Sequence, residues 1–354
     1  MAADRDASTE LGERVQRAAG QGTPLDIVAG GSKGFLGRIT QSETLDVSAH
    51  RGILSYEPSE LVLTARAGTP LAEIEDALAV SGQMLAFEPP HFGPSATLGG
   101  TVAGALSGPR RPYAGAARDF VLGVKILSGE GRPLSFGGQV MKNVAGYDVS
   151  RLMVGAMGTL GVLLEISLKV LPRPARDATV TFAMDAPAAI EAMNAWAGKP
   201  LPLSGAYHDE DRLHVRLSGT AGGVDRAIER LGGEAGDGSE RWRALREHTL
   251  AFFDTELPLW RLSLPAATPP LALPGQTLID WGGALRWLKS DADVSRIRPA
   301  VAEVGGHATL YRNGDRHGDV FHPLTSAMLA LHRRLKASFD PKGVLNRGRM
   351  YPAL

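Results

Sequence analysis

Cysteine is absent from this chain of 354 residues. Its absence excludes disulfide bonds, thiol catalysis and the attachment of a cofactor through a cysteinyl sulfur. It also excludes an iron–sulfur cluster of the ordinary cysteine-ligated kind. If the protein passes electrons onward through such a cluster, the cluster must belong to another subunit.

Net charge and long apolar runs are missing as well. Lys plus Arg and Asp plus Glu both total 38, so nothing attracts the chain to nucleic acid or to an anionic membrane. No apolar run reaches the roughly 18 residues that span a bilayer. The N-terminal MAADRDASTE lacks the apolar segment of a secretory signal. We therefore expect a cytoplasmic protein that meets the inner membrane only peripherally, through a complex.

Glycine is abundant instead, with 43 of 354 residues, against an average usage of about 7%. Fifteen of these glycines lie between Gly93 and Gly161, and no short repeat explains them. A residue without Cβ lets the backbone approach a ligand closely. We interpret this half of the chain as backbone that lies against a bound molecule.

Hydrophobic periodicity and turn residues predict an α+β protein whose first domain covers residues 1–174. Thr69 and Pro70 are predicted to cap and open a helix that ends near Gly82. The alternation from Val162 to Val170 predicts a strand with one buried face, which Leu171–Pro174 ends. The other elements expected in this domain are a helix at 9–19 and strands at 25–29, 53–56, 61–67, 121–127 and 133–136.

The order of elements changes after residue 176. A βαββα series is predicted at 179–184, 187–197, 203–208, 212–218 and 224–231. Two further strands, a helix at 294–304 and a strand at 307–312 follow. We expect residues 175–322 to form a small α+β cap domain. Residues 323–354, with a helix at 323–338, are predicted to be a C-terminal segment that returns to the first domain.

The first glycine-rich loop, GGSKG at 30–34, matches the G-x-S-x-G elbow of serine hydrolases. That elbow joins a mid-sheet strand to a helix, whereas this loop follows the first strand and no helical periodicity comes after it. A plain glycine turn is a simpler interpretation than a nucleophile at Ser32. A phosphate cradle is the better functional hypothesis, because N–H groups of consecutive glycines converge on an anion and Lys33 adds a charge. Neither G-x-G-x-x-G nor a P-loop is present.

Two longer stretches continue the glycine-rich pattern. In EPPHFGPSATLGGTVAGALSGPRRPYAGAARDFVLGVKIL (88–127), Thr97 is predicted to open a helix of small residues. Its N-terminus is expected to present free N–H groups and a positive dipole to a pyrophosphate. A similar glycine-rich arrangement recurs in the third stretch, KNVAGYDVSRLMVGAMGTLGVLLEISLKVLP (142–172). Both stretches favour a dinucleotide site.

These three stretches, in this order and spacing, resemble the FAD-binding module of the vanillyl-alcohol oxidase or PCMH superfamily. Within it the chain is most similar to the FAD-binding E subunits of bacterial glycolate oxidase (glycolate dehydrogenase) complexes. GHATL at 306–310, FHPL at 321–324 and FDPKGVLNRGRMYP at 339–352 extend the resemblance to the whole chain. It implies a two-subdomain PCMH-type FAD-binding domain, then the cap, with the C-terminal tail packed on the FAD domain.

The resemblance also implies the residues that hold FAD. The loop from Ala29 to Lys33 corresponds to the pyrophosphate loop, in which Ser32 donates a hydrogen bond. The other implied cofactor-binding residues are Pro89, Pro90, Gly93, Thr97, Gly99, Gly100, Ala103, Ala105, Gly108, Gly158, Gly161, Val162 and Asn346. Arg347 departs from the proline expected in the closing motif. Cysteine is absent and His91 is the only histidine in the first two stretches, so we expect non-covalent FAD with His91 in the pocket wall.

Oxidation of a hydroxy acid needs a carboxylate anchor and a base or a metal. Catalytic relatives carry the metal-binding pattern His-x-Gly-Asp-Gly-Asn-x-His, but this chain has only fragments of it, so no bound metal is expected. His307, Arg312 and His322 are weak catalytic candidates. Arg316 is a further possible anchor, although surface arginines are common. The tryptophans at 242, 260, 281 and 287 are interpreted as cap-core or interface residues.

The resemblance implies oxidation of glycolate, a small 2-hydroxy acid, to glyoxylate. Electrons would pass from the flavin to an iron–sulfur subunit, beside a sister FAD-binding catalytic subunit. Two alternatives stay open at this point. The chain is either a non-catalytic structural or relay flavoprotein next to that sister subunit, or a stand-alone oxidoreductase for another 2-hydroxy acid.

Overall fold

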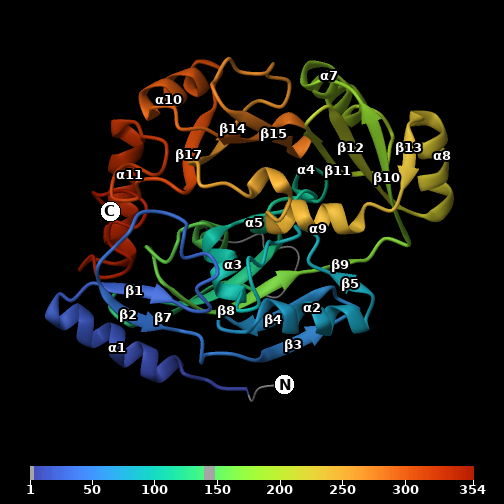
Figure 1. Cartoon of the computed structure of the whole chain (residues 1–354). Helices are drawn as coiled ribbons and strands as arrows, with labels where there is room; N and C mark the ends of the chain where they lie inside the picture. The colour runs from blue at the N-terminus through green and yellow to red at the C-terminus, as the bar shows by residue number, and fades with distance from the viewer. Residues whose placement is uncertain (1–3, 139–147) are drawn as a thin grey trace.

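The computed structural model describes residues 4–138 and 148–354. Residues 142–147 of the third glycine-rich stretch lie outside this description. The chain mixes helices with antiparallel sheets, which confirms the expected α+β class. In Figure 1 a five-stranded sheet with a small parallel sheet forms the lower half, and an eight-stranded sheet forms the upper half.

The five-stranded sheet has the order β3-β4-β8-β6-β7, and every pair in it is antiparallel. Its strands are β3 (Ile53–Glu57), β4 (Val62–Arg66), β6 (Val121–Leu127), β7 (Pro133–Gly137) and β8 (Val162–Lys169). The prediction of one buried face for β8 was wrong. Leu163 and Ile166 pack in one core while Val162 and Leu164 pack in another. A central strand covered on both sides buries residues of either parity.

The second of these cores joins the N-terminal helix to the end of the chain. In α1 (Ser8–Gln21), Leu11, Val15 and Ala18 form the apolar stripe, as the 3.6-residue period requires. They pack against β1 (Leu25–Val28) and β2 (Glu43–Asp46), which pair in parallel. Leu345 forms a bridge to β1, so the tail adds to this layer.

The helices of the lower half lie close to the glycine-rich loops. Thr69 was expected to cap the helix α2 (Leu71–Val80), but Pro70 is the N-cap. The Thr69 hydroxyl instead donates to Arg66 O at 2.7 Å and accepts from Gly52 N at 2.9 Å. The remaining elements are β5 (Gln83–Met84), α3 (Leu98–Gly104), α4 (Arg111–Ala114), α5 (Ala117–Phe120), α6 (Val149–Met153) and β9 (Leu171–Pro172).

The eight-stranded sheet has the order β13-β10-β12-β11-β15-β16-β14-β17. Its strands are β10 (Arg176–Ala183), β11 (Leu203–Asp209), β12 (Arg212–Gly219), β13 (Glu234–Gly236), β14 (Leu259–Ser263), β15 (Gln276–Asp280), β16 (Leu285–Lys289) and β17 (His307–Arg312). Apolar residues of α7 (Ala186–Ala197) and α8 (Ala221–Leu231) pack on one half, and α10 (Val294–Glu303) packs on the other. The βαββα order expected after residue 176 is confirmed.

Two helices connect the halves. α9 (Ser239–Glu247), which the sequence did not predict, crosses between the two sheets in Figure 1. Glu247 at its end accepts from the backbone N–H groups of His91 and Phe92, at 3.0 and 2.8 Å. α11 (Ser326–Phe339) contributes Leu335 and Phe339 to the lower core. The chain passes from the five-stranded sheet to the eight-stranded sheet between β8 and β10. The domain limits at residues 174 and 322 stay predictions.

Candidate functional site: a glycine-lined cavity and a second pocket beneath the cap

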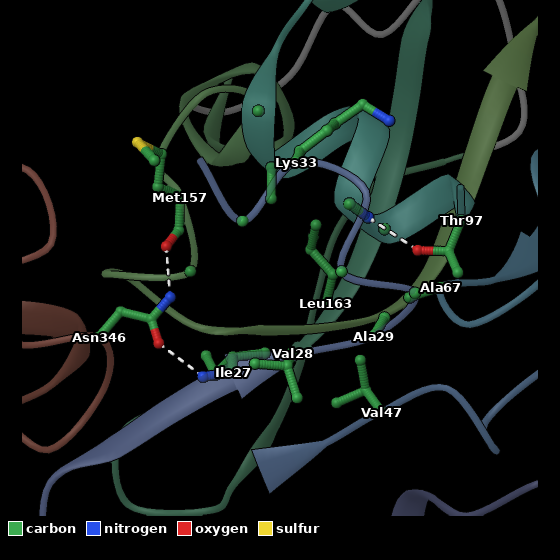
Figure 2. A pocket seen from close by; sticks show the side chains of 18 of the residues that line it. Ile27, Val28, Ala29, Lys33, Val47, Ala67, Thr97, Met157, Leu163 and Asn346 are labelled. Carbon is green, nitrogen blue, oxygen red and sulfur yellow. Dashed lines mark hydrogen bonds between the residues drawn. The ribbon is translucent and has the colours of Figure 1, made fainter. Parts of the chain in front are cut away.

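A cavity of about 230 Å³ lies where β1, α3 and the C-terminal tail meet. Figure 2 shows its lining: β1 and the loop after it on one side, α3 on another, and Asn346 of the tail. Six of its lining residues are glycines of the sequence-predicted site: Gly30, Gly31, Gly99, Gly100, Gly158 and Gly161. The predicted glycine stretches therefore converge on one cavity.

We call residues 30–33 of this lining the glycine cradle. Among the described residues, none of the backbone N–H groups of Gly30, Gly31, Ser32 and Lys33 has a hydrogen-bond acceptor. Gly31 has a φ of 70°, which favours glycine. A Cβ on Gly30 would overlap the carbonyl oxygen of Ser95. Four unpartnered N–H groups in a loop without obstructing side chains are typical of an anion site.

The two polar side chains of the cradle support an anion rather than a nucleophile. Ser32 Oγ lies 3.4 Å from Lys33 Nζ, and Lys33 Nζ also donates to His91 O at 3.3 Å. Burial lowers the pKa of Lys33 to about 8, against the opposing effect of the Glu247 carboxylate. No helix follows the loop, so the elbow geometry of a serine hydrolase is absent here.

The N-terminus of α3 differs from the expectation of free N–H groups. Leu98 N donates to Thr69 O at 2.9 Å and Gly99 N to Ala67 O at 2.7 Å, while Thr97 caps Gly100 N at 3.2 Å. A Cβ on Gly99 would come within 2.8 Å of the Ala67 side chain. The glycines of α3 therefore permit close packing against the turn that follows β4, and the N–H groups of Leu98, Gly99 and Gly100 are not free for a ligand.

Asn346 of the tail closes the cavity. Its side chain accepts from Ile27 N at 2.7 Å and donates to Met157 O at 2.6 Å (Figure 2). A Cβ on Gly158 would lie 2.7 Å from Asn346 Nδ2, and Gly158 has a φ of 73°. One amide thus joins the first strand, the loop before β8 and the last residues of the chain.

The sequence missed much of the apolar wall. The lining residues not predicted include Ile27, Val28, Leu36, Val47, Ala67, Met157 and Leu163. No local signal identifies them, because they are ordinary strand and turn residues that lie here only in the folded chain. Of the predicted set, Ala29, Ser32, Lys33, Thr97, Ala103 and Asn346 also line this cavity, whereas Pro89, Pro90, Gly93, Ala105, Gly108 and Val162 do not. Pro90 and Gly108 line a second, smaller cavity against the cap.

Arginines of the segment after β17 and of the tail bind the loop that directly follows the cradle. Arg316 donates to Gly37 O at 2.8 Å and to Gly34 O at 2.9 Å, and Arg349 donates to Gly34 O at 3.0 Å. These contacts give Arg316, a possible carboxylate anchor in the sequence, a structural role. Arg38, which follows this loop, in turn donates to Gly348 O of the tail at 2.9 Å.

Two of the three catalytic candidates lie near each other, and the third is engaged elsewhere. The rings of His307 and His322 lie 6.4 Å apart, and His322 Nδ1 accepts from Ala308 N. Arg312 instead lies over Phe35 and Phe92, at 4.1 and 4.6 Å from the ring centres. Within residues 4–138 and 148–354, no three potential metal ligands form a group.

The second cavity, which we call the cap-side pocket, has a volume of about 30 Å³. The cap contributes Asp280 of β15, Trp281 and Arg261 of β14, and the lower half contributes Pro90 and Gly108. Trp281 Nε1 donates to Gly108 O at 3.0 Å. Of the predicted tryptophans, 242, 260, 281 and 287 are all buried, as expected for core or interface residues.

The cradle fits the diphosphate of a dinucleotide, and the apolar wall beside it fits a flat ring. Residues 7–137 match the family model described as FAD binding domain. Alkyldihydroxyacetonephosphate synthase has a similar fold, with a TM-score of 0.67 at 16% identity, over 96% of this chain and 75% of that one. The fold and the site therefore define a FAD-binding protein of the PCMH type.

Two curated relatives narrow the assignment. The chain is 51% identical to glycolate oxidase subunit GlcE of Escherichia coli over 100% of both chains. It is 31% identical to D-lactate dehydrogenase of Archaeoglobus fulgidus over 59% of this chain and 47% of that protein. The chain belongs to the family of glycolate oxidase subunit GlcE. Among its described helices, none combines the length and the apolar character needed to cross a bilayer.

Proposed function

We propose that this chain is the FAD-binding subunit of a complex that oxidises glycolate, a 2-hydroxy acid, to glyoxylate. The observation that carries the proposal is the full-length identity of 51% to glycolate oxidase subunit GlcE. The four unpartnered N–H groups of the cradle support the cofactor part independently, because a diphosphate supplies the acceptors that they lack.

The residues that would hold FAD follow from the cavity. The N–H groups of residues 30–33 and the Lys33 ammonium would bind the diphosphate. Gly158, Gly161 and Asn346 would form the opposite wall. Non-covalent binding is supported by the absence of cysteine and by His91, whose Nε2 is engaged by Glu75 at 3.1 Å. When bound, FAD supplies the hydride acceptor, and the protein supplies orientation and electrostatics.

The partners belong to the same proposal. A chain without cysteine has no ligands for an ordinary iron–sulfur cluster, so the iron–sulfur relay that we propose would belong to another subunit. A sister FAD-binding catalytic subunit completes the proposed complex. Such a complex would hold this cytoplasmic chain peripherally at the inner membrane. The limits proposed for the FAD domain, cap and tail are 1–174, 175–322 and 323–354.

Anaerobic mixing with glycolate tests the function. The purified chain is expected to be yellow, with FAD released intact by denaturation, and to lose its absorbance near 450 nm when glycolate is added. A chain that binds no FAD would contradict the whole proposal. FAD binding without bleaching, in the isolated chain and with partners present, would contradict glycolate oxidation alone.

A second candidate, a relay flavoprotein, is favoured by the broken histidine pattern. The rings of His307 and His322 lie 6.4 Å apart, but the sequence around them lacks the unbroken metal-binding pattern of catalytic relatives. Bleaching of this flavin only after the catalytic partner and glycolate are both added would favour the relay.

A further inference from the structure

The cap-side pocket contains charged groups that lack partners. Asp280 is 4% exposed, and its Oδ1 accepts from Trp281 N at 2.6 Å. Its Oδ2 has no donor among the described residues. The guanidinium of Arg261 has neither an ion pair nor a hydrogen bond within the described chain, although it lies in the same pocket wall. Asp280 is buried and Arg261 is half-buried over the Trp281 ring. Charges removed from water normally have ionic or hydrogen-bond partners, so the opening of both groups onto a common pocket points to a ligand.

Trp281 orients these groups. Two guanidinium groups lie over its indole, with Arg111 at 4.3 Å and Arg261 at 5.1 Å from the ring centre. Its φ of 53° is unusual for a bulky residue, and Gly282 and Gly283 follow with φ of 64° and 103°. Backbone strain of this kind costs about 1–3 kcal/mol and persists where the surrounding structure enforces it. The indole hydrogen bond to Gly108 O holds the turn against the lower half.

We propose that Asp280 accepts the hydroxyl proton of the 2-hydroxy acid and that Arg261 binds its carboxylate. This inference rests on the proposed function. Pro90 and Gly108, which the family resemblance includes among the cofactor-binding residues, form the facing wall. Both ends of the substrate would then have a partner of complementary chemistry within one pocket.

The proposed step balances in atoms and electrons. The O–H bond breaks and its proton moves to the Asp280 carboxylate. The C–H bond on the same carbon breaks, and FAD, when bound, would supply the acceptor for this hydrogen and its electron pair. The carbon–oxygen bond becomes a carbonyl. The 2-hydroxy acid is thus oxidised by two electrons and the flavin is reduced by two.

The protonation state of Asp280 suits this role. Burial raises the pKa of Asp280 to about 7, although the Trp281 N–H and the charges of Arg216 and Arg261 act in the opposite direction. The ionisable groups that face it are Glu88, Tyr113, Tyr207, Arg216 and Arg261. Proton acceptors work best with a pKa near the operating pH. Oxidation should therefore accelerate as the pH rises through about 7, while binding of an anion should weaken.

Asp280→Asn tests the proton acceptor, because asparagine keeps the shape and the acceptor for Trp281 N but removes the base. In the FAD-loaded full chain we expect the rate of flavin bleaching by glycolate to fall about 10²–10⁴-fold, and its rise with pH to disappear. Asp209→Asn is the matched control: this carboxyl also has a raised pKa, from burial, but lines a different cavity. FAD content and thermal unfolding should not change in either variant.

Arg261→Met tests the carboxylate anchor with a readout that needs no turnover. Oxalate, a two-carbon dicarboxylate, should quench tryptophan fluorescence in the FAD-loaded chain, because Trp281 lines the pocket. We expect its affinity to fall at least 10-fold in Arg261→Met and to rise in Asp280→Asn. Arg243→Met on the exposed side of α9 is the control.

The outcomes separate this inference from the function on which it rests. Glycolate bleaching that survives Asp280→Asn at the wild-type rate, or oxalate binding unchanged in Arg261→Met, overturns the inference and leaves the function standing. A wild-type flavin that glycolate never reduces overturns both the oxidation and the role of Asp280. Loss of FAD on Asp280→Asn would assign the residue to cofactor binding instead.

Discussion

The glycine cradle and the cap-side pocket achieve recognition by opposite means. The cradle presents consecutive backbone N–H groups from one loop, and its main requirement is that side chains be absent. The cap-side pocket brings side chains together from β14, β15 and the segment before α4, which are distant in sequence. A backbone site should therefore be sensitive to added atoms, and a side-chain site to removed ones.

Gly30→Ala should have the largest effect on the cradle. The new Cβ would overlap Ser95 O, so the loop must move and the N–H groups must separate. We expect loss of bound FAD, measured as the ratio of 450 nm to 280 nm absorbance, with a lower unfolding temperature. Gly20→Ala on α1 is the control, because a Cβ there meets nothing within 4 Å. Full flavin content in Gly30→Ala would show that the cradle tolerates side chains.

Glu88→Gln tests the side-chain contacts between the two halves. Glu88 pairs with Arg216 at 2.8 Å and with Arg110 at 3.3 Å, and all three are largely buried. Removing one charge from such a group costs about 3–5 kcal/mol, measurable as the free energy of unfolding in urea. Glu240→Gln, at an exposed pair with Arg243, should change little.

The same pairing predicts a pH dependence. Burial opposes ionisation, but Arg216 and Arg110 outweigh it and hold the pKa of Glu88 below 4.5. The stabilisation is present above this unfolded-state pKa and is lost as the pH falls toward the folded value. The wild type should thus lose more stability than Glu88→Gln between pH 5 and pH 3, estimated as about one unit either side of the carboxyl pKa.

Lys33→Met should weaken FAD binding about 10-fold, in line with about 1.5–3 kcal/mol for hydrogen bonds to charged groups. The pKa of Lys33 is lowered to about 8 by burial, so wild-type affinity should decline as the pH rises through this value. A bound diphosphate favours the charged form of Lys33, so the decline in affinity should occur at a higher pH in its presence. Titration of the apoprotein with FAD at pH 7 and pH 9, roughly one unit below and above this pKa, measures both effects. Equal FAD affinities for Lys33→Met and the wild type would show that the Lys33 charge does not contribute to FAD binding.

Ser32→Ala should have the smallest effect, about fivefold on FAD affinity, because the backbone donors remain and a single hydrogen bond contributes about 1 kcal/mol. Activity toward esters should be absent in both proteins. If the substitution abolished an esterase activity of the wild type, the hydrolase interpretation of the loop would return.

The sequence predicted the fold class, the order of most elements and the convergence of the glycine stretches. These predictions succeeded because they rest on local rules: side-chain periodicity in β10 and α7, turn residues between β6 and β7, and the conformational freedom of Gly31. Thr69 shows the limit of such rules. Its position before Pro70 is typical of a helix cap, but its hydroxyl forms hydrogen bonds with Gly52 N and Arg66 O instead. Gly52 lies beside Thr69 only in the folded chain.

The family resemblance, rather than periodicity, indicated FAD and Asn346. The cap-side pocket had no sequence signal at all, since Asp280 and Arg261 are separated by a strand and a loop, and neither lies in a motif. His307 lies in the GHATL motif, but it neighbours His322, whereas the guanidinium of Arg312 lies over Phe35.

By itself the sequence determined that the first loop has little side-chain bulk and many N–H groups, because these are properties of consecutive residues. Only the tertiary structure decided which donors remain without acceptors. The first N–H groups of α3 donate to the turn after β4 and to Thr97, whereas those of the cradle have no acceptor among the described residues. It also decided which buried charges share a pocket, because burial and pairing depend on segments that meet only in the folded chain.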